Sequence, residues 1–230
     1  MLRRQEDTYK HKGARAKLIA ELEQKGIADK SVLQAMNIVP RHYFFNSALD
    51  EHFNSALNEH AYEDKAFPIG NDQTISQPYT VAFQSQLMQI KKMDKVLEIG
   101  TGSAYQATVL AELGAQIYTI ERQKGLYDKN LLGYPFKGKY PMLKFFYGDG
   151  FKGLPTFAPF DKILITAGVS LVPEKLLEQL KPNGIIVLPL GEEDKQIMTR
   201  ITKLPNGELQ TESFGEFIFV PMLEGVNSRG

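Results

Sequence analysis

The stretch V-L-E-I-G-T-G-S-A-Y-Q, residues 96–106, constrains the fold of this chain more than any other. An apolar run typical of a buried strand ends at Ile99, Gly100 and Gly102 interrupt it, and residues 103–113 carry the apolar spacing of a helix. A glycine turn lets backbone N–H groups approach a ligand closely, and the start of the helix adds the positive end of its dipole. The stretch therefore predicts a strand, a turn and a helix that together bind a cofactor.

The spacing within the turn favours one class of cofactor. A dinucleotide site needs G-x-G-x-x-G, because the third glycine lets the helix pack close to the pyrophosphate, and here Tyr105 stands at that position. Glu98 instead completes the E-x-G-x-G pattern of S-adenosylmethionine (SAM) methyltransferases. A carboxylate at a strand end suits a ligand with a cationic amino group. A plain tight turn is the alternative for so short a pattern, so the flanking residues must decide.

From Lys95 onward, strand and helix patterns alternate, which predicts an α/β fold: a Rossmann-like, doubly wound and mostly parallel sheet. The expected strands are 96–99, 116–120, 142–147, 162–166 and 184–190, and the clearest helices are 103–113 and 173–180. Residues 196–202 and 207–220, joined by a Pro-Asn-Gly turn, predict a C-terminal antiparallel hairpin. Segment 123–140 holds three glycines and one proline, so we expect a short or partly irregular crossover there.

The region before the sheet is expected to be largely helical. Lys10 to Gly26 carries an amphipathic pattern, Asp29 can cap a second helix, and Pro78 can open a third. We expect one domain, 1–230, in three parts: an N-terminal helical extension (1–60), a substrate and catalytic loop with its helix (61–94), and a SAM-binding core with the C-terminal strands (95–230).

Composition excludes several functions. The 27 basic and 27 acidic residues balance, so no strong field attracts nucleic acid or an anionic membrane, and no apolar run is long enough to span a membrane. The chain has no cysteine, and its four histidines lie at no metal-ligand spacing, so we expect no metal. The first residues lack the apolar stretch of a secretory signal, which favours the cytoplasm.

Acidic residues follow two further expected strands. Glu121 lies nineteen residues after Gly102, where an acidic side chain can accept both ribose hydroxyls of a nucleoside. Asp149, between two glycines, could bind an adenine amino group. The alternatives are a solvated carboxylate for Glu121 and an Asx turn for Asp149. Because these features all fall at carboxyl ends of strands, together they favour a nucleoside site.

Upstream of the sheet lies A-F-P-I-G-N-D-Q-T-I-S-Q-P-Y, residues 66–79. Thr74 and Ser76 precede the helix that Pro78 opens, so capping of that helix by their hydroxyls is the structural interpretation. Catalysis by one of these hydroxyls is the other.

This block is the specific part of a resemblance to the protein-L-isoaspartate O-methyltransferase family. The glycine-turn block, Y-G-D-G, A-P-F-D-K-I-L-I-T-A-G, L-K-P-N-G-I-I-V-L-P-L-G, F-V-P and Val39-Pro40-Arg41 also resemble that family, from about residue 15 to about residue 224. The resemblance implies SAM as cofactor and L-isoaspartyl residues of damaged proteins and peptides as substrate. It implies Ser76 as the active-site hydroxyl and places Val220 near the bound peptide. The implied cofactor contacts are Thr74, Ile75, Glu98, Gly100, Thr101, Gly102, Ser103, Glu121, Asp149 and Gly150. A small-molecule methyltransferase and a non-catalytic SAM-fold binding protein remain as alternatives.

The chain departs from the family pattern at three places. Ala104 stands where glycine is usual, and we expect its methyl group to tighten packing without loss of binding. Segment 123–140 replaces a more regular helix, and Thr166-Ala167-Gly168 replaces the usual T-A-A, a change we expect to be neutral.

Overall fold

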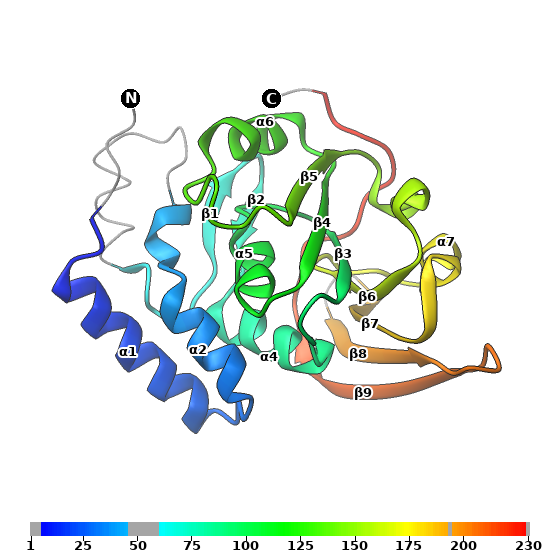
Figure 1. The fold of residues 1–230 in the computed structure, drawn as a ribbon, viewed down its shortest axis with the longest axis horizontal. Coiled ribbons are helices and arrows are strands. Elements are labelled where there is room, and N and C mark those ends of the chain that lie inside the picture. The colour runs from blue at the N-terminus through cyan, green and yellow to red at the C-terminus, as the bar shows by residue number, and fades with distance from the viewer. Residues whose placement is uncertain (1–5, 46–59, 193–194, 229–230) are drawn as a thin grey trace.

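The fold is described here from a computed structural model, which defines residues 6–45, 60–192 and 195–228. Its centre is a seven-stranded sheet with the strand order β5-β4-β3-β6-β7-β8-β9 (Figure 1). The strands are β3 (Lys95–Ile99), β4 (Gln116–Glu121), β5 (Leu143–Tyr147), β6 (Phe160–Ile165), β7 (Leu180–Glu192), β8 (Lys195–Lys203) and β9 (Leu209–Phe217). The first five are parallel, and β8 and β9 join antiparallel. This confirms the doubly wound, mostly parallel sheet with an antiparallel C-terminal pair.

The strand order reverses beside β3. From β3 the chain moves outward to β4 and β5, then crosses back to β6 on the other side of β3 and continues to β7. Such a switch point leaves a crevice at the carboxyl ends of the central strands, where open α/β sheets bind ligands.

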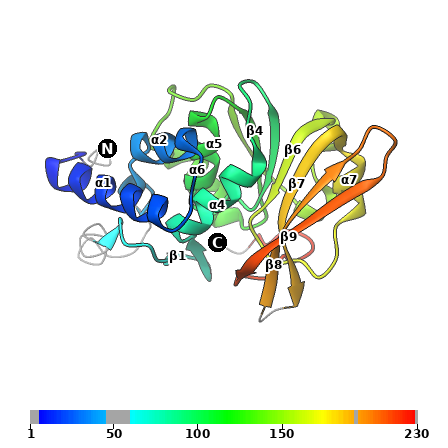
Figure 2. The same cartoon turned by 90° about the horizontal axis from the view of Figure 1, so that it is seen from below.

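Helices cover both faces of the sheet. They are α1 (Tyr9–Gln24), α2 (Lys30–Ile38), α4 (Pro78–Met88), α5 (Tyr105–Glu112), α6 (Lys124–Gly133) and α7 (Glu174–Glu178), with 3-10 turns η1 (Arg41–Phe44), η2 (Gly150–Lys152) and η3 (Pro155–Phe157). Successive strand residues point to opposite faces, so Val96 joins the core beneath α4 and α5, whereas Leu97 joins the core that holds Leu176 of α7. Figure 2 shows α1, α2, α4 and α5 on one side of the sheet and α7 on the other. Within the described ranges, no helix combines the length and hydropathy that crossing a membrane requires.

The N-terminal helices form an outer layer over α4 and α5. Leu18 and Leu22 of α1 and Met36 of α2 are buried in the same core as those helices. Asp29 caps α2 as expected, because its side chain accepts hydrogen bonds from the backbone N–H groups of Ser31 and Val32. The part of the expected 1–60 extension at 46–59 lies outside the described residues.

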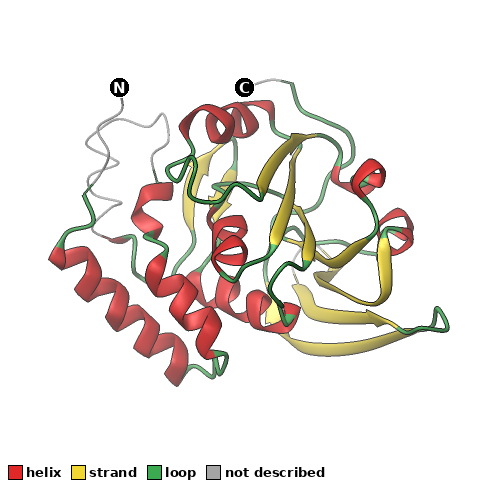
Figure 3. Ribbon diagram, viewed as in Figure 1, coloured by secondary structure: helices red, strands yellow, loops and turns green. Residues whose placement is uncertain are grey.

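A small hairpin stands apart from the main sheet. It pairs β1 (Phe67–Gly70) with β2 (Gln73–Ile75), and Ser76 and Gln77 connect it directly to α4 (Figure 3). The block 66–79, expected as an ordered loop followed by a helix, is thus a hairpin that delivers Ser76 to the start of α4.

The crossover after β4 is partly irregular, as expected: helix α6 spans ten residues, and the stretch after Gly133 is irregular. Three other elements differ from expectation. Helix α7 spans five residues, and α5 begins at Tyr105 because Ala104 has left-handed backbone. Strand β9 ends at Phe217, and the following residues leave the hairpin to cross the carboxyl edge of the sheet.

Candidate active site

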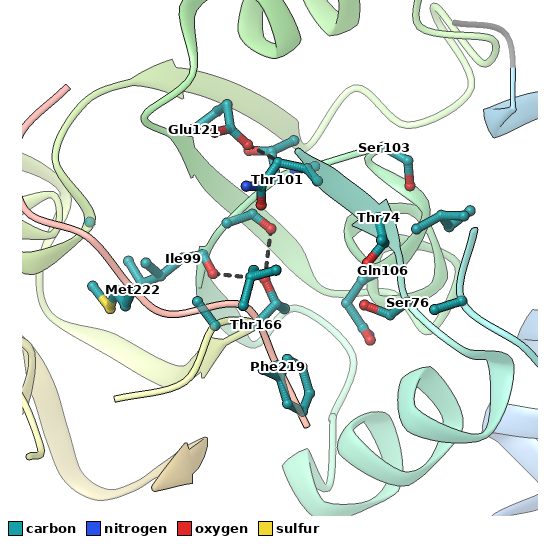
Figure 4. A pocket seen from close by; sticks show the side chains of 18 of the residues that line it. Thr74, Ser76, Ile99, Thr101, Ser103, Gln106, Glu121, Thr166, Phe219 and Met222 are labelled. Atoms are coloured by element: carbon teal, nitrogen blue, oxygen red, sulfur yellow. Dashed lines mark hydrogen bonds between the residues drawn. The ribbon is translucent and has the colours of Figure 1, made fainter. Parts of the chain in front are cut away.

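A cavity of about 370 Å³ opens at the carboxyl ends of β3, β4 and β6 (Figure 4). The β1–β2 hairpin with the start of α4 closes one side, and the C-terminal segment 218–223 closes another. The site residues expected from the sequence that line this cavity are Thr74, Ile75, Ser76, Gly100, Thr101, Gly102, Ser103, Glu121, Gly150 and Val220. Glu98 and Asp149 are not among the lining residues. The fold therefore brings the glycine turn and the Ser76 block, well separated in the chain, to one cavity.

The glycine turn needs glycine for conformation and for space. Gly100 has φ +96° and Gly102 has φ +51°, and a Cβ atom added to Gly100 would lie 2.5 Å from the hydroxyl oxygen of Thr166. That Thr166 hydroxyl donates to the carbonyl oxygens of Ile99 and Gly100, at 2.9 and 2.8 Å. Thr166, the first residue of T-A-G, thus fastens the turn to the end of β6.

Ala104 corrects one expectation. Its φ of +68° lies in the left-handed region, and its side chain is fully buried. A left-handed conformation costs an L-residue with a Cβ atom about 1–2 kcal/mol, which glycine avoids. A glycine at position 104 would avoid this cost, so Ala104 brings conformational strain in addition to the tighter packing expected from the sequence.

Glu98 lies beneath the turn, with no exposed surface. The Thr119 hydroxyl donates to Glu98 Oε2 at 2.6 Å, so its oxygen accepts from the Thr101 hydroxyl, also at 2.6 Å. Burial raises the pKa of Glu98 to about 8, with a further contribution from the negative charge of Glu121. The structure thus gives Glu98 the role of fixing Thr101 through Thr119, where the sequence suggested direct ligand contact.

Glu121 is the carboxylate in the cavity wall. It is 5% exposed, and its two oxygens accept the backbone N–H groups of Gly102 at 2.9 Å and Gln123 at 2.8 Å. Burial raises its pKa, and hydrogen bonds from backbone N–H groups oppose that shift. A carboxylate oxygen has a second lone pair. Glu121 can therefore brace the turn and still accept hydroxyl groups of a ligand.

Asp149 and Gly150 have different roles. Asp149 Oδ1 accepts the backbone N–H of Phe151 at 3.0 Å, which is the Asx turn considered from the sequence. Gly150 is in the lining, and a Cβ atom there would lie 2.4 Å from Ile99 Cγ2 and 3.0 Å from Met222 Cε. Glycine at 150 thus lets η2 lie directly against the end of β3.

The hydroxyls of Thr74 and Ser76 do not cap α4. The N-cap residue of α4 is Gln77, and its side chain makes no capping hydrogen bond. The backbone N–H of Tyr79 instead donates to Asp64 Oδ1 at 2.7 Å. The capping interpretation is therefore wrong. Ser76 lines the cavity together with Gly100 and Gly102, and the Thr74 carbonyl oxygen lies 4.0 Å from a Cβ built on Gly102.

Several lining residues were not among the site residues expected from the sequence. Gln106 lies in the first turn of α5, where its Nε2 donates to the Ser85 hydroxyl at 2.9 Å. Thr166, Phe219 and Met222 complete the wall around Ile99 (Figure 4). The sequence signal that could have identified Gln106 is its position just after the glycine turn.

The C-terminal segment reaches the cavity by pairing with the loop after β6. Val220 accepts the backbone N–H of Gly168 at 2.8 Å, and the Met222 N–H donates back to the Gly168 carbonyl at 2.8 Å. Residues expected at the end of a hairpin strand therefore form a wall of the site.

The fold also brings together three potential metal-ligating residues whose spacing in the sequence did not suggest a site. Ligand atoms of Asp7, His11 and His42 lie within 4.8 Å of one another, away from the cavity. The two imidazole rings stack with centroids 3.9 Å apart, so their in-plane lone pairs do not converge on one point. Arg15 binds both oxygens of Asp7. This is the geometry of a packed polar joint between the start of α1 and η1.

The cavity's ionisable groups are few. The described lining has no histidine, lysine or aspartate, and its charged side chains are those of Glu121 and Arg122. Glu121 is committed to two backbone N–H groups. The site thus offers hydroxyls, backbone N–H groups, one braced carboxylate and one guanidinium, a set suited to binding a nucleoside and orienting a second ligand.

Comparison with known proteins agrees with this geometry. The profile of the family described as protein-L-isoaspartate(D-aspartate) O-methyltransferase (PCMT) matches residues 13–227. A protein-L-isoaspartate O-methyltransferase of Flavobacterium johnsoniae is 52% identical over 96% of this chain and 99% of its own. One of Cytophaga hutchinsonii is 50% identical over 97% of this chain and 98% of its own.

Solved structures show the same fold. A protein-L-isoaspartate O-methyltransferase superposes with a TM-score of 0.76 at 26% identity, covering 90% of this chain and 65% of that one. For a Plasmodium falciparum protein described as a putative member, in complex with S-adenosyl-L-homocysteine, the TM-score is 0.74 at 24% identity, covering 93% of this chain and 98% of that one. From its sequence, its fold and the composition of its cavity, this chain belongs to the protein-L-isoaspartate O-methyltransferase family.

Proposed function

We propose that this chain transfers the methyl group of SAM to the free α-carboxylate of L-isoaspartyl residues in damaged proteins and peptides. The observation that carries the proposal is the meeting of Ser76 with the glycine turn in one cavity. The relatives at about half identity carry the name of this activity.

The residues present fit SAM. The cavity of about 370 Å³ lies within the range of small-molecule sites. Glu121 would accept the ribose hydroxyls, and Thr74, Ile75, Gly102 and Gly150 would line the cofactor on its other sides. When bound, SAM supplies a methyl group on a sulfonium that leaves as a neutral thioether.

Ser76 would orient the acceptor. The substrate carboxylate is already ionised at pH 7, so the reaction needs no general base, in agreement with the sparse ionisable groups of the described lining. The Ser76 hydroxyl would donate a hydrogen bond that aims one carboxylate oxygen at the methyl group. Fixing two reactants in line can supply about 7–11 kcal/mol. Fixed donors must also offset the lost hydration of the carboxylate.

The product explains how methylation begins repair. A methyl ester is a better electrophile than a carboxylate, so the neighbouring backbone nitrogen attacks it, expels methanol and closes a succinimide. Hydrolysis of the succinimide gives the chain another chance at a normal aspartyl linkage.

The three parts expected from the sequence divide this work in the proposal. Residues 95–230 hold the cofactor, residues 61–94 present Ser76, and residues 1–60 support that presentation. The cytoplasmic location expected from the sequence stays a prediction, which cell fractionation with an antibody would test.

A methyl-transfer assay tests the proposal. The protein is incubated with methyl-labelled SAM and either an isoaspartyl peptide or its normal aspartyl twin. We expect base-labile label on the isoaspartyl peptide alone. Label on a small-molecule panel but on neither peptide would identify a different methyltransferase, and binding of SAM without any transfer would identify a non-catalytic protein.

A further inference from the structure

Arg41 is a fully buried cation just outside the cavity. Its guanidinium donates to three backbone carbonyl oxygens: that of Ala61 at 2.6 Å, that of Lys65 at 3.0 Å and that of Ser76 at 3.0 Å. A planar guanidinium can hold several carbonyls in a fixed arrangement, which a lysine ammonium on a flexible stem cannot. Burial lowers the pKa of Arg41 to about 10, which leaves it charged at neutral pH.

These carbonyls join two segments that are distant in sequence. Ala61 and Lys65 bound a short stretch that also contains Asp64, and the third carbonyl belongs to the proposed active-site residue. Asp64 acts just after that residue, where it accepts the backbone N–H of Tyr79 and the side-chain amide of Gln77. The connection from the hairpin to α4 is therefore held at Ser76 itself and at the start of α4.

The aromatic surroundings of Arg41 link this connection to the cofactor turn. The guanidinium carbon lies 5.0 Å from the ring centroid of Phe45, 5.6 Å from that of Phe67 in β1 and 5.9 Å from that of Tyr105. Tyr105 lines the cavity and is the first residue of α5, directly after the glycine turn. One side chain from the N-terminal region thus contacts both walls whose separation sets the distance between Ser76 and the cofactor.

We propose that Arg41 is a positioning residue: through the carbonyl of Ser76 and the ring of Tyr105, it fixes the Ser76 hydroxyl relative to the cofactor turn. This rests on the proposed function, because only then does the position of Ser76 govern a rate. The N-terminal helices in this account supply a brace for catalysis in addition to a cover for the core.

The test is a double-mutant cycle with Arg41→Lys and Ser76→Ala, read by the single-turnover rate of methyl transfer to an isoaspartyl peptide with SAM prebound. A small displacement of a reacting group can cost up to about 100-fold, so we expect Arg41→Lys alone to lower the rate about tenfold. SAM affinity should stay within about twofold, since Arg41 is not in the lining. In the Ser76→Ala background, Arg41→Lys should change the rate less than about twofold, because the group it positions is gone.

Arg15→Lys is the matched control. Arg15 is also a buried arginine of the N-terminal region, 5% exposed, but it binds Asp7 and, within the 61–65 stretch, the hydroxyl of Tyr62, whereas Arg41 binds the Ser76 carbonyl. We expect it to lower the melting temperature about as much as Arg41→Lys does and to leave the methyl-transfer rate unchanged. An equal loss of rate in both variants would show that Arg41 is merely structural.

Additive effects of Arg41→Lys and Ser76→Ala would also overturn the proposal. Should Arg41→Lys not fold, Asp64→Ala takes its place in the same cycle, with the same non-additivity expected. Amide hydrogen exchange supplies a readout that needs no activity: Arg41→Lys, but not Arg15→Lys, should speed exchange at residues 74–77. Unchanged exchange there contradicts the brace, whereas wild-type protein inert toward the isoaspartyl peptide contradicts the proposed function.

Discussion

The two walls of the cavity are built in different ways. The glycine turn is held from the sheet itself. The N–H groups of Gly100 and Thr101 donate to the Ile120 carbonyl at 2.9 and 3.2 Å, beside the parallel pairing of β3 with β4, and Thr166 and Glu121 brace the turn from the ends of neighbouring strands. The connection at Ser76 is held by side chains remote in sequence, Arg41 and Asp64. The turn is thus dictated by local sequence and sheet topology, whereas the position of Ser76 depends on the N-terminal region.

Loss of the Ser76 hydroxyl is expected to have the largest effect. Ser76→Ala should lower kcat on an isoaspartyl peptide about 100-fold, because the carboxylate is no longer aimed at the methyl group. Calorimetry should show SAM affinity and thermal stability close to wild type. Ser76→Thr, which keeps a hydroxyl, should retain part of the activity. A kcat for Ser76→Ala equal to that of wild type would show that the Ser76 hydroxyl has no part in the mechanism.

The buried carboxyl beneath the turn should make stability depend on pH. The pKa of Glu98 is raised from about 4.5 to about 8, so the folded protein holds a proton that the unfolded chain releases between these values. The associated stability is complete below about pH 4.5 and is lost as the pH rises toward 8.

In Glu98→Gln, the new side chain has nearly the same shape as that of Glu98 and carries no charge. As the pH rises from 6 to 8, we expect the unfolding free energy of this variant to increase by about 2 kcal/mol relative to that of wild type. Urea unfolding at the two pH values measures the gain. The same pH dependence in both proteins would mean that Glu98 is ionised when folded.

Substitutions of Asp149 distinguish a direct contact with the cofactor from a role in shaping the loop. Asp149→Ala should weaken SAM binding about tenfold, or about 1.4 kcal/mol, and leave the KM of the peptide unchanged. Asp149→Asn can keep the bond to Phe151 N–H but presents an amide donor on its other side. If the aspartate accepts the adenine amino group, the asparagine variant stays weak in calorimetry. Full recovery of affinity would leave Asp149 only the Asx turn.

Ala104→Gly should have the smallest effect, and it should be favourable. Removing a Cβ atom at φ +68° relieves strain, partly offset by the greater freedom of glycine in the unfolded chain. We expect a gain of about 0.5–1 kcal/mol, seen as a rise of roughly 1–4 °C in melting temperature, with unchanged SAM affinity. A lower melting temperature would show that packing of the Ala104 methyl group outweighs the strain.

Sequence alone predicted the parallel core because its signals are local. Strand and helix periodicity gave the β3–β7 alternation, and the strand-end rule brought Gly100, Glu121 and Gly150 to one edge. The positive φ of Ala104 was not predicted, because the apolar spacing of a helix does not show the sign of φ at a single residue. The roles of Arg41 and Asp64 were missed because each acts across a contact that only the folded chain creates.

A crystal structure of the chain with S-adenosylhomocysteine and an isoaspartyl peptide tests most directly how the two walls cooperate. We expect the cofactor's ribose on Glu121, its sulfur facing a peptide carboxylate, and the Ser76 oxygen about 2.5–3.0 Å from that carboxylate. A cofactor bound elsewhere, or a peptide carboxylate out of reach of Ser76, would contradict the account.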